Sequence, residues 1–297
     1  MDVTSLHIIT LWCAILSKTI RGVDRLLPKG MTIISFRLLW TLDQSQALGN
    51  SVNELARMLV VRPKDVEAAF VNLCNGGLVL EEDLGGSVRY RITPDGNRCL
   101  ERIASEIEGF IERSFAQLDN DAFDTIMTMV YDALAKPGNY YSKQMMPFVR
   151  GDAVPTFYYI TAVDMMHRTL SLAIKRDYGL SFTDFRFLLE LYPKRPYVSK
   201  LIRAKKFIHY LRVGRAYITT ASYRLEEDGY LRRVPDPDDA RGVSFQINEM
   251  GEKVVQEIGG NIYAAYVSLF GTSQDAQRRQ LSALRQLLEG TDEELES

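Results

Sequence analysis

The feature that most constrains the fold of this chain is a repeat within its own sequence. A gapless alignment pairs residues 51–79, "SVNELARMLVVRPKDVEAAFVNLCNGGLV", with residues 203–231, "RAKKFIHYLRVGRAYITTASYRLEEDGYL". The alignment superimposes apolar positions: Leu55 on Phe207, Leu59 on Leu211, Val66 on Ile218 and Leu73 on Leu225. Upstream, "SFRLLW" matches "DFRFLL", and downstream "ITPDG" matches "INEMG". This period indicates one unit of about 145 residues written twice.

The hydrophobic pattern predicts the same order of elements in both repeats. A long amphipathic helix comes first, followed by a second helix, two short helices, a β-hairpin and further long helices. The second helices are expected at 32–43 and 182–191, and the short helices at 51–59, 63–75, 203–211 and 215–227. Gly77 and Gly229 end the last short helix of each repeat, because glycine adopts the left-handed conformation most easily. The predicted fold is therefore mainly α with small β-hairpin wings.

Domain boundaries follow from the repeat and from the helix breakers between its copies. We expect a first unit at residues 1–135, a linker at 136–155 and a second unit at 156–297. Of the 36 Lys and Arg, 13 lie in the first unit, and of the 38 Asp and Glu, 18 do, so the rest of the chain is the basic part. Three scattered cysteines indicate a reducing cytoplasm, and the apolar run "LHIITLWCAIL" is too short to span a membrane.

Helix, helix, short helix, turn, short helix and hairpin is the order of a winged helix-turn-helix module. Such a module places its second short helix, the recognition helix, in the major groove of DNA, while the hairpin tip reaches the minor groove. One stretch, "SYRLEEDGYLRRVPDPDDARGVSFQINEMGEKVV" (222–255), resembles the MarR regulators of bacteria in its recognition-helix end, Gly-hydrophobic pair, basic residues and "DPDDAR" wing. The resemblance covers nearly the whole chain, once per repeat, and is closer in the second repeat.

The resemblance implies a DNA-binding transcription regulator of the bacterial cytoplasm that works without a cofactor. Members of the family pair two identical chains, whereas here two copies are fused. We therefore expect tandem winged helices, with helical dimerisation elements, to fold as a pseudo-dimer within one chain and to recognise an asymmetric operator. An exchange of units between two chains would give a higher oligomer. Family members often hold a small aromatic ligand, so an aromatic effector is expected as a second partner.

In the second repeat, candidate DNA contacts lie on the recognition helix, before it and at the wing. Helical spacing turns Ile218, Ser222 and Leu225 inward. The predicted contacts are Arg215, Tyr217, Thr219, Thr220, Tyr223 and Arg224 on the outer face, with Arg203, Lys205, Lys206 and Arg212 before it. By the resemblance, Asp239 holds the wing arginine, and Arg241 is that arginine and enters the minor groove, where Arg is favoured.

The first repeat is less suited to DNA. Its candidate contacts are Arg62, Lys64, Arg89 and Arg91, but Asp65 and Glu67 share the outer face of its recognition helix. Two carboxylates facing a polyanion are unfavourable unless one of them accepts a hydrogen bond from cytosine. Two interpretations remain open: this half binds a different half-site, or it barely binds DNA.

Aromatic side chains near the first helices are candidates for lining an effector cleft. The set is Trp12, Phe36, Trp40, Tyr158 and Phe185, although aromatic residues at helical spacing more often belong to a core. Cys13 lies on an apolar stripe, which favours an inert buried thiol over a redox sensor. The three histidines, His7, His167 and His209, lack partners at metal-ligand spacing, and no phosphate loop or nucleophile elbow is present. The sequence therefore predicts neither a metal site nor an enzyme.

Two functions from different classes remain. The first is a ligand-responsive regulator that binds an asymmetric operator as a single chain. The second is a degenerate winged-helix pseudo-dimer that contacts proteins or senses a ligand and binds little DNA. The basic second recognition helix and its wing favour the first, because a protein adaptor does not need them.

Overall fold

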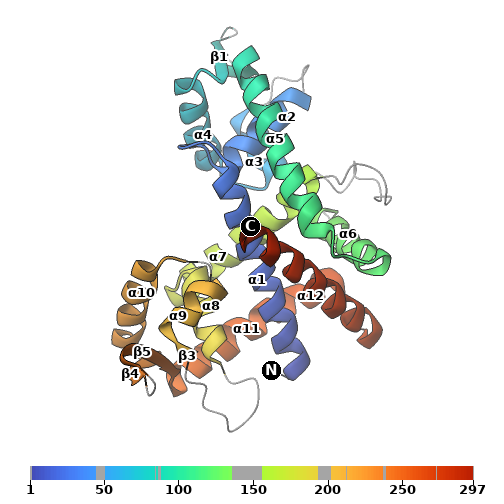
Figure 1. Cartoon of the computed structure of the whole chain (residues 1–297). Helices are drawn as coiled ribbons and strands as arrows, with labels where there is room; N and C mark the ends of the chain where they lie inside the picture. Colours follow the sequence, from blue (N-terminus) through green and yellow to red (C-terminus); the bar gives the residue numbers. More distant parts are fainter. Residues whose placement is uncertain are drawn as a thin grey trace. The chain divides into compact units, whose positions relative to one another are not determined.

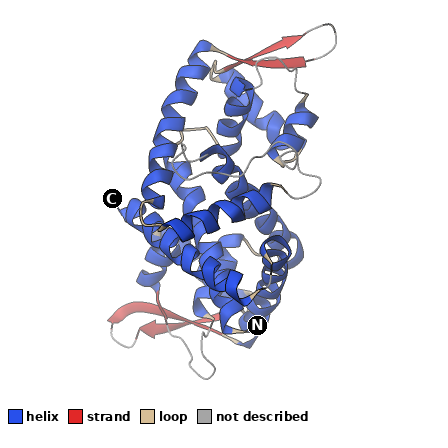
Figure 2. Ribbon diagram, turned by 90° about the vertical axis from the view of Figure 1, so that its right-hand side faces the viewer, coloured by secondary structure: helices blue, strands red, loops and turns tan. Residues whose placement is uncertain are grey.

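Helices make up most of this protein, and its strands form two small antiparallel sheets (Figures 1 and 2). The computed structural model describes residues 2–44, 51–83, 85, 88–135, 156–192, 202–211, 213–236, 239–271 and 273–296. Within these residues the predicted fold class, mainly α with small β-hairpin wings, is confirmed. The expected linker at 136–155 lies outside the described residues.

The elements of the first half of the chain follow the predicted order. They are α1 (Val3–Leu26), α2 (Ile33–Gln44), α3 (Val52–Leu59), α4 (Pro63–Asn75), β1 (Val79–Asp83), β2 (Val88–Ile92), α5 (Pro94–Phe115) and α6 (Asn120–Leu134). Helices α3 and α6 begin after Ser51 and Asp119, whose side chains accept backbone hydrogen bonds at the helix N-terminus. Strands β1 and β2 pair in antiparallel register. We call the segment from α2 to β2 the first winged helix.

The second half repeats this order and adds one short strand. Its elements are α7 (Thr156–Tyr178), α8 (Phe182–Leu191), β3 (Ile202–Arg203), α9 (Ala204–Leu211), α10 (Arg215–Glu227), β4 (Leu231–Asp236), β5 (Asp239–Ile247), α11 (Glu249–Phe270) and α12 (Gln274–Glu296). The sheet order is β3-β5-β4. We call the segment from α8 to β5 the second winged helix. Strand β3 was not predicted: Arg203 was assigned to the start of the following helix, and Ile202 to no element.

Packing divides the chain into two compact units, and each unit draws on distant parts of the sequence. Unit 1 comprises Met1–Ile15 with His167–Leu284, and unit 2 comprises Leu16–Met166 with Arg285–Ser297. Unit 1 therefore contains the second winged helix, and unit 2 contains the first. Helices α1, α7 and α12 contribute residues to both units. The boundaries expected from the repeat describe the sequence rather than this packing, and they stay a prediction.

In unit 2, α2 and α4 of the first winged helix form a core together with α5. Phe36, Phe70 and Ile107 come from these helices and are almost completely buried. Burying apolar side chains of this size stabilises a fold by roughly 1.5–3 kcal/mol each. Helix α12 also approaches α5 so closely that a Cβ added at Gly290 would overlap the backbone oxygen of Ser114. Glycine is therefore needed where these two helices meet.

In unit 1, aromatic rings fill the core. Phe187 of α8 stacks on Phe207 of α9 with ring centroids 4.2 Å apart, and Phe245 of β5 lies 5.2 Å from Phe187. Trp12 of α1 meets Tyr266 of α11 edge-on at 5.2 Å. Such pairs add to the stabilisation that burial alone provides. Trp12, which precedes the first winged helix in the sequence, therefore belongs to the core of the unit that holds the second.

The two winged helices share the same junction between the wing and the following helix. Thr93 Oγ1 accepts a hydrogen bond from the N–H of Gly96 at 2.9 Å and donates one to the carbonyl of Gly77 at 2.8 Å. Asn248 accepts from the backbone N–H three residues further on at 3.0 Å and donates to the carbonyl of Gly229 at 2.6 Å. In each case one side chain caps the helix and closes the turn after the recognition helix. This junction fixes where each wing leaves the helical body.

Helix α1 is longer than the apolar run "LHIITLWCAIL" that was judged too short to span a membrane. Its 24 residues are long and apolar enough to cross a membrane, judged by length and composition alone, and it is the one such helix among the described residues. Within its most apolar stretch, 72% of the residues are buried inside the protein. Core helices of soluble proteins pass the same test, so the length of α1 is weak evidence for a membrane span.

Candidate nucleic-acid interface

Helix α10 is the predicted recognition helix of the second repeat, and its outer face is polar and partly cationic. The helix begins at Arg215, after Gly214 at the N-cap, and ends at Glu227. Ile218, Ser222 and Leu225 are buried, so their predicted inward direction is confirmed. The exposed side chains of the outer face include Arg215, Thr219, Thr220, Tyr223 and Arg224. These groups donate hydrogen bonds or carry positive charge, as a surface that contacts bases and phosphates requires.

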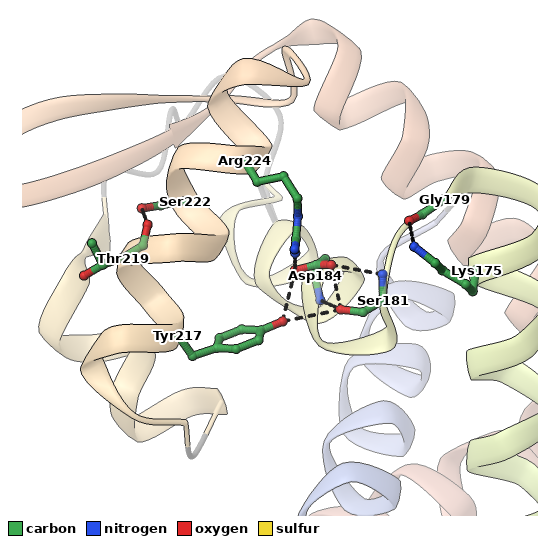
Figure 3. A network of polar contacts seen from close by, with 8 residues as sticks. All are labelled: Lys175, Gly179, Ser181, Asp184, Tyr217, Thr219, Ser222 and Arg224. Atoms are coloured by element: carbon green, nitrogen blue, oxygen red, sulfur yellow. Dashed lines mark hydrogen bonds and ion pairs between the residues drawn. The ribbon is translucent and has the colours of Figure 1, made fainter.

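A buried carboxylate behind α10 holds two of its side chains (Figure 3). Asp184 of α8 is 2% exposed, and its Oδ1 accepts hydrogen bonds from the Tyr217 hydroxyl at 3.0 Å and from Arg224 Nη2 at 2.5 Å. Its Oδ2 accepts from the backbone N–H of Ser181 at 3.0 Å and from the Ser181 hydroxyl at 2.6 Å. Ser181 Oγ in turn accepts from the Asp184 N–H, which completes a capping box. The buried negative charge is thus paired with one cation and satisfied by further donors.

The direction of Tyr217 differs from the prediction. The spacing predicted an outward side chain, but Tyr217 is half-buried and its hydroxyl points at Asp184 (Figure 3). Burial raises the pKa of Tyr217, and the negative charge of Asp184 raises this pKa as well. The hydroxyl therefore keeps its proton at neutral pH and donates to the carboxylate. Helical periodicity missed this direction because the acceptor lies on another helix.

Tyr223 is supported from the wing. Its side chain is 58% exposed, and the guanidinium carbon of Arg233 on β4 lies 3.4 Å from the centre of its ring. A cation over an aromatic face is attracted by the ring's negative face. The backbone N–H of Arg233 also donates to the Glu226 carboxylate at 2.7 Å, which ties the wing to α10. Sequence reasoning did not single out Arg233, whose role depends on the contact between strand and helix.

A second buried acid secures the wing itself. Asp236 at the end of β4 accepts a hydrogen bond from the Ser244 hydroxyl at 3.0 Å and pairs with Arg203 of β3 at 3.1 Å. Arg203, a predicted DNA contact, is thus tied to the wing and 33% exposed. The resemblance had assigned the holding role to Asp239 and the groove contact to Arg241. Both belong to β5, but their side chains lie outside the described part of the chain, so those roles stay predictions.

Other predicted contacts of the second repeat lie just before α10. Lys205 and Lys206 are exposed in the first turn of α9. Arg212, between α9 and α10, lies outside the described residues. Exposed lysines here add positive charge to the side of the molecule that carries α9 and α10. Their contribution to DNA binding is not sequence-specific, because phosphates are the same at every base pair.

The first winged helix pairs its cations internally. Arg62, at the N-cap of α4, donates to both oxygens of Asp65 at 2.8 Å, which raises the pKa of Arg62. Arg91 of β2 pairs with Glu82 of β1 at 2.8 Å. Lys64, Glu67 and Arg89 are exposed. The exposed set also includes three large apolar side chains, Val71 at 59%, Leu80 at 48% and Val88 at 45%. Two of the four predicted cationic contacts of the first winged helix, Arg62 and Arg91, are therefore engaged by carboxylates.

The aromatic residues predicted to line an effector cleft do not lie together in the structure. Trp12, Phe36 and Phe185 are buried in cores, and Trp12 and Phe185 belong to unit 1 while the other members belong to unit 2. Trp40 is half-buried and stacks on Phe157 at 5.2 Å, next to half-buried Tyr158. Most of these aromatic residues therefore belong to a core, which was the alternative interpretation of their helical spacing. Trp40 and Tyr158 remain as partly exposed aromatic groups.

The remaining candidate groups are Cys13 and the three histidines. Burial raises the pKa of the Cys13 thiol to about 12, although the nearby Arg186 guanidinium acts in the opposite direction. His167 packs edge-on against Phe182. His7 is half-buried, and the His209 side chain is not described. Among the described residues, no cluster of three or more His, Cys, Asp or Glu is arranged to hold a metal ion.

Comparisons with known proteins find transcriptional regulators. Residues 169–258 match the family described as Transcriptional regulator SarA/Rot, and this segment contains the whole second winged helix. One relative is the HTH-type transcriptional regulator BilQ of Clostridioides difficile (strain CD3), which is 33% identical over 54 residues. That match covers 18% of this chain and 36% of the relative. The chain therefore spans about a third of the length of the curated relative that it matches.

Two solved structures are also similar to parts of this chain. One is Sco3205 of Streptomyces coelicolor, a MarR family transcriptional regulator solved in complex with DNA, with a TM-score of 0.40 and 21% identity over 50% of this chain and 92% of that one. The other is the transcriptional regulator Tm0710 of Thermotoga maritima, with a TM-score of 0.30 and 25% identity over 46% of this chain and 92% of that one. The descriptions of these matches name regulators and not enzymes. The second winged helix is thus similar in sequence to the SarA/Rot domain of transcriptional regulators.

Proposed function

We propose that this protein is a DNA-binding transcriptional regulator whose second winged helix makes the main contact with duplex DNA. The observation that carries the proposal is the outer face of α10, where exposed Arg215, Tyr223 and Arg224 share one surface with two threonines. Arginine recognises guanine through two parallel hydrogen bonds, and threonine and tyrosine hydroxyls bond to phosphates or bases. The match of residues 169–258 to a regulator family supports the same assignment.

We also propose that the two halves contribute unequally and that the operator is asymmetric. In the first winged helix, Arg62 and Arg91 are already paired with carboxylates, and Glu67 lies exposed on α4. Phosphate binding gains its free energy from counterions released by unpaired cations, so these pairs weaken the contribution of α4 and of the β1–β2 wing. The second winged helix also pairs Arg224 and Arg203 with buried acids, but its Arg215, Lys205 and Lys206 side chains are exposed. A fused chain can maintain this difference, because its halves need not be identical.

The third part of the proposal is that the two sequence copies pair within one chain. Three contacts inside unit 2 support it, because each joins a residue before position 136 to one after position 155. Thr19 and Tyr159 share a hydrogen bond, Lys18 pairs with Asp292, and Arg37 pairs with Asp164. Covalent fusion raises the effective concentration of each copy for the other, which favours this pairing over exchange between chains.

A DNA-binding series tests the main proposal. The full chain is titrated against a fluorescent duplex of mixed sequence, and the dissociation constant is measured by anisotropy at several salt concentrations. Each phosphate contact should contribute about −0.9 to the slope of log affinity against log salt. Arg215→Ala should weaken binding and flatten the slope, while Arg62→Ala, its matched control in the first winged helix, should change both less. Absence of binding at low salt, or a response to salt that is flat, would overturn the proposal.

Cleavage tests the pairing of the copies. A protease site introduced between residues 138 and 151 allows the linker to be cut in the folded protein. The two fragments should co-elute under native conditions, and the uncut chain should scatter light as a particle near 33.8 kDa. Fragments that separate as independent soluble domains would contradict the pairing. A doubled mass with intact pairing would instead assign the contacts to two exchanged chains.

We further propose that a small aromatic effector acts near Trp40. The supporting observation is that half-buried Trp40 and Tyr158 both contact the ring of buried Phe157 in unit 2. Titration of a Trp12→Phe variant with benzoate, followed by Trp40 fluorescence, tests it. Saturable quenching is expected, and a strictly linear collisional response would contradict an effector site here.

The alternative function, a protein-interaction module, has one observation in its favour. Val71, Leu80 and Val88 are large apolar side chains that the first winged helix leaves exposed. Scattered apolar side chains are common on protein surfaces, so three of them do not define an interface. The same DNA titration separates the two functions, because a pure protein adaptor would show no salt-dependent binding.

A further inference from the structure

We propose that Asp184 is a positioning residue that sets how selectively the second recognition helix reads base sequence. This inference rests on the proposed DNA-binding function and deepens it. Asp184 is 2% exposed and lies behind α10, so it does not itself touch DNA. Its effect is carried by the side chains that it holds.

The geometry gives the carboxylate two separate tasks. Oδ2 serves the start of α8, where it accepts the two hydrogen bonds from Ser181. Oδ1 serves α10, where it accepts from Tyr217 at 3.0 Å and Arg224 at 2.5 Å (Figure 3). Tyr217 and Arg224 are seven residues apart, which is about two helical turns, so both lie on the same side of α10. These two hydrogen bonds on one side of α10 restrict the rotation of the helix about its own axis.

The exposed fractions of Asp184 and Arg224 show that an anchored side chain still reaches the protein surface. Asp184 is buried, but the Arg224 side chain is 49% exposed, so the anchored guanidinium still reaches the surface. A planar guanidinium with one nitrogen anchored presents its other edge in a restricted set of orientations. Ordering a long side chain before binding reduces the entropy lost at the interface. We therefore expect the ordered Arg224 side chain to bind one base edge more tightly than the others, whereas a mobile arginine would adjust to several base edges.

The first winged helix lacks this arrangement. The repeat aligns Ser35 with Asp184, and it aligns Asp65 and Asn72 with Tyr217 and Arg224. Ser35 makes a 3.0 Å hydroxyl contact with Thr32 at the start of α2, so this position keeps the local capping task. The carboxylate on α4 instead holds Arg62. The two winged helices thus differ in residue type at these three aligned positions. In the second, the three residues anchor recognition helix α10 to α8; in the first, the aligned residues do not anchor α4 to α2 in this way.

A purely structural role for Asp184 makes a different prediction. If Asp184 served only to join α8 to α10, its loss would lower the folded fraction and weaken specific and non-specific DNA binding by the same factor. A positioning role changes the ratio of the two affinities. Removing a negative charge near the interface also favours any DNA slightly, so non-specific binding should hold or strengthen.

The experiment measures this ratio in the full chain. A preferred duplex is first selected from a random library with the unmodified protein, and its affinity is compared with that of a scrambled duplex at one salt concentration. Asp184→Asn keeps the size and the capping ability of the side chain but removes the charge that holds Arg224. The ratio should fall about ten- to hundred-fold, the discrimination expected of one arginine–base contact. Asp228→Asn, an equal charge change at the exposed end of α10, is the control and should leave the ratio unchanged.

A second set of variants tests whether Asp184 acts through Arg224. In an Arg224→Ala background, adding Asp184→Asn should lower the ratio no more than Tyr217→Phe does, because only the Tyr217 anchor is left to lose, whereas a full independent loss would overturn the inference. Tyr217→Phe removes one anchor without a change of charge and should give a smaller fall, which keeps the test open if Asp184→Asn does not fold. An unchanged ratio in folded Asp184→Asn or, failing that, in Tyr217→Phe, would refute the positioning role while leaving DNA binding intact. Failure of the unmodified chain to bind any duplex would refute the proposed function itself.

Discussion

The buried ion pair between Arg37 and Asp164 offers the sharpest test of how unit 2 is held together. Both side chains are almost fully buried, at 0% and 2% exposure, and Arg37 Nη1 lies 2.6 Å from Asp164 Oδ2. Arg37 Nη2 also donates to the carbonyl of Leu59, the last residue of α3, at 2.6 Å. One arginine therefore connects α7 to the short helix that precedes recognition helix α4. Asp164→Asn keeps the shape of the acid but leaves the guanidinium charge without its anion.

The expected cost follows from the burial of the pair. Removing one partner of a buried ion pair destabilises a protein by about 3–5 kcal/mol, because the remaining charge stays desolvated. With a urea dependence of about 2 kcal/mol per molar, the unfolding midpoint should fall by about 2 M. Arg37→Met should cost a similar amount, since it strands the carboxylate. The double variant Arg37→Met/Asp164→Leu should recover much of the loss, because no buried charge remains.

The assay uses the position of the two tryptophans. Trp12 belongs to unit 1 and Trp40 to unit 2, so a Trp12→Phe background lets fluorescence report unfolding of unit 2. Glu106→Gln is the control within unit 2, since Glu106 pairs with Arg102 on helix α5 but is exposed, and its loss should change the midpoint little. A midpoint for Asp164→Asn equal to that of the control would refute the reasoning. So would a double variant whose loss equals the sum of the two single losses.

Three further predictions concern local features. Gly290→Ala should destabilise unit 2 by about 1–3 kcal/mol in thermal melts, because its Cβ would overlap α5 backbone, whereas exposed Gly260→Ala should be neutral or stabilise by up to about 1 kcal/mol. Asn248→Ala should cost about 1–2 kcal/mol in urea denaturation, because it removes a helix cap and the donor to Gly229. The pKa of Cys13 is raised in the folded state, so its contribution to stability is present below about pH 8.5 and lost as pH rises toward about 12. Urea unfolding of Cys13→Ala between pH 9 and pH 11 should therefore show a shallower loss than the unmodified chain.

The periodic parts of this fold could be predicted from the sequence because they depend on neighbours three or four residues away. Ile218, Ser222 and Leu225 face inward on α10 as the spacing predicted. On α4, Val66 and Phe70 are buried in the same way. A helix that packs one face against a core shows that face in its own sequence. The same holds for the hairpins, which the hydrophobic pattern predicted after the recognition helix of each repeat.

The Asp184 network could not be predicted in this way. Ser181 and Asp184 form a local capping signal that is visible in the sequence, but one oxygen of the carboxylate remains for partners elsewhere. Those partners, Tyr217 and Arg224, are 33 and 40 residues away in the chain. Only the packing of α8 against α10 brings them together. The sequence located the polar face of α10 and missed which of its side chains are fixed from behind.

The wing shows a similar limit. The resemblance directed attention to Asp239, whereas the described buried acid is Asp236, which accepts from Ser244 and pairs with Arg203. The strand register shifts between Pro235 and Asp236, and such an irregularity re-aims a side chain relative to simple alternation. The partner Arg203 lies on β3, a strand too short to be recognised. The register shift and the ion pair with Arg203 both depend on how the strands pair in the folded sheet. The pattern of neighbouring residues therefore does not predict them.

The inequality of the two halves extends from the proposed DNA surface into the core. Arg37 and Arg186 occupy aligned positions of the repeat, and both are buried. Each also donates to a backbone carbonyl near the end of the short helix before its recognition helix, at Leu59 and Tyr210. Arg37 pairs with the carboxylate of Asp164, and the guanidinium of Arg186 lies close enough to the Cys13 thiol to act on its pKa. Two identical subunits would surround both arginines with the same residues. If the copies pair within one chain as proposed, fusion allows the residues around each buried arginine to differ, so the halves can differ in stability as well as in the bases they contact.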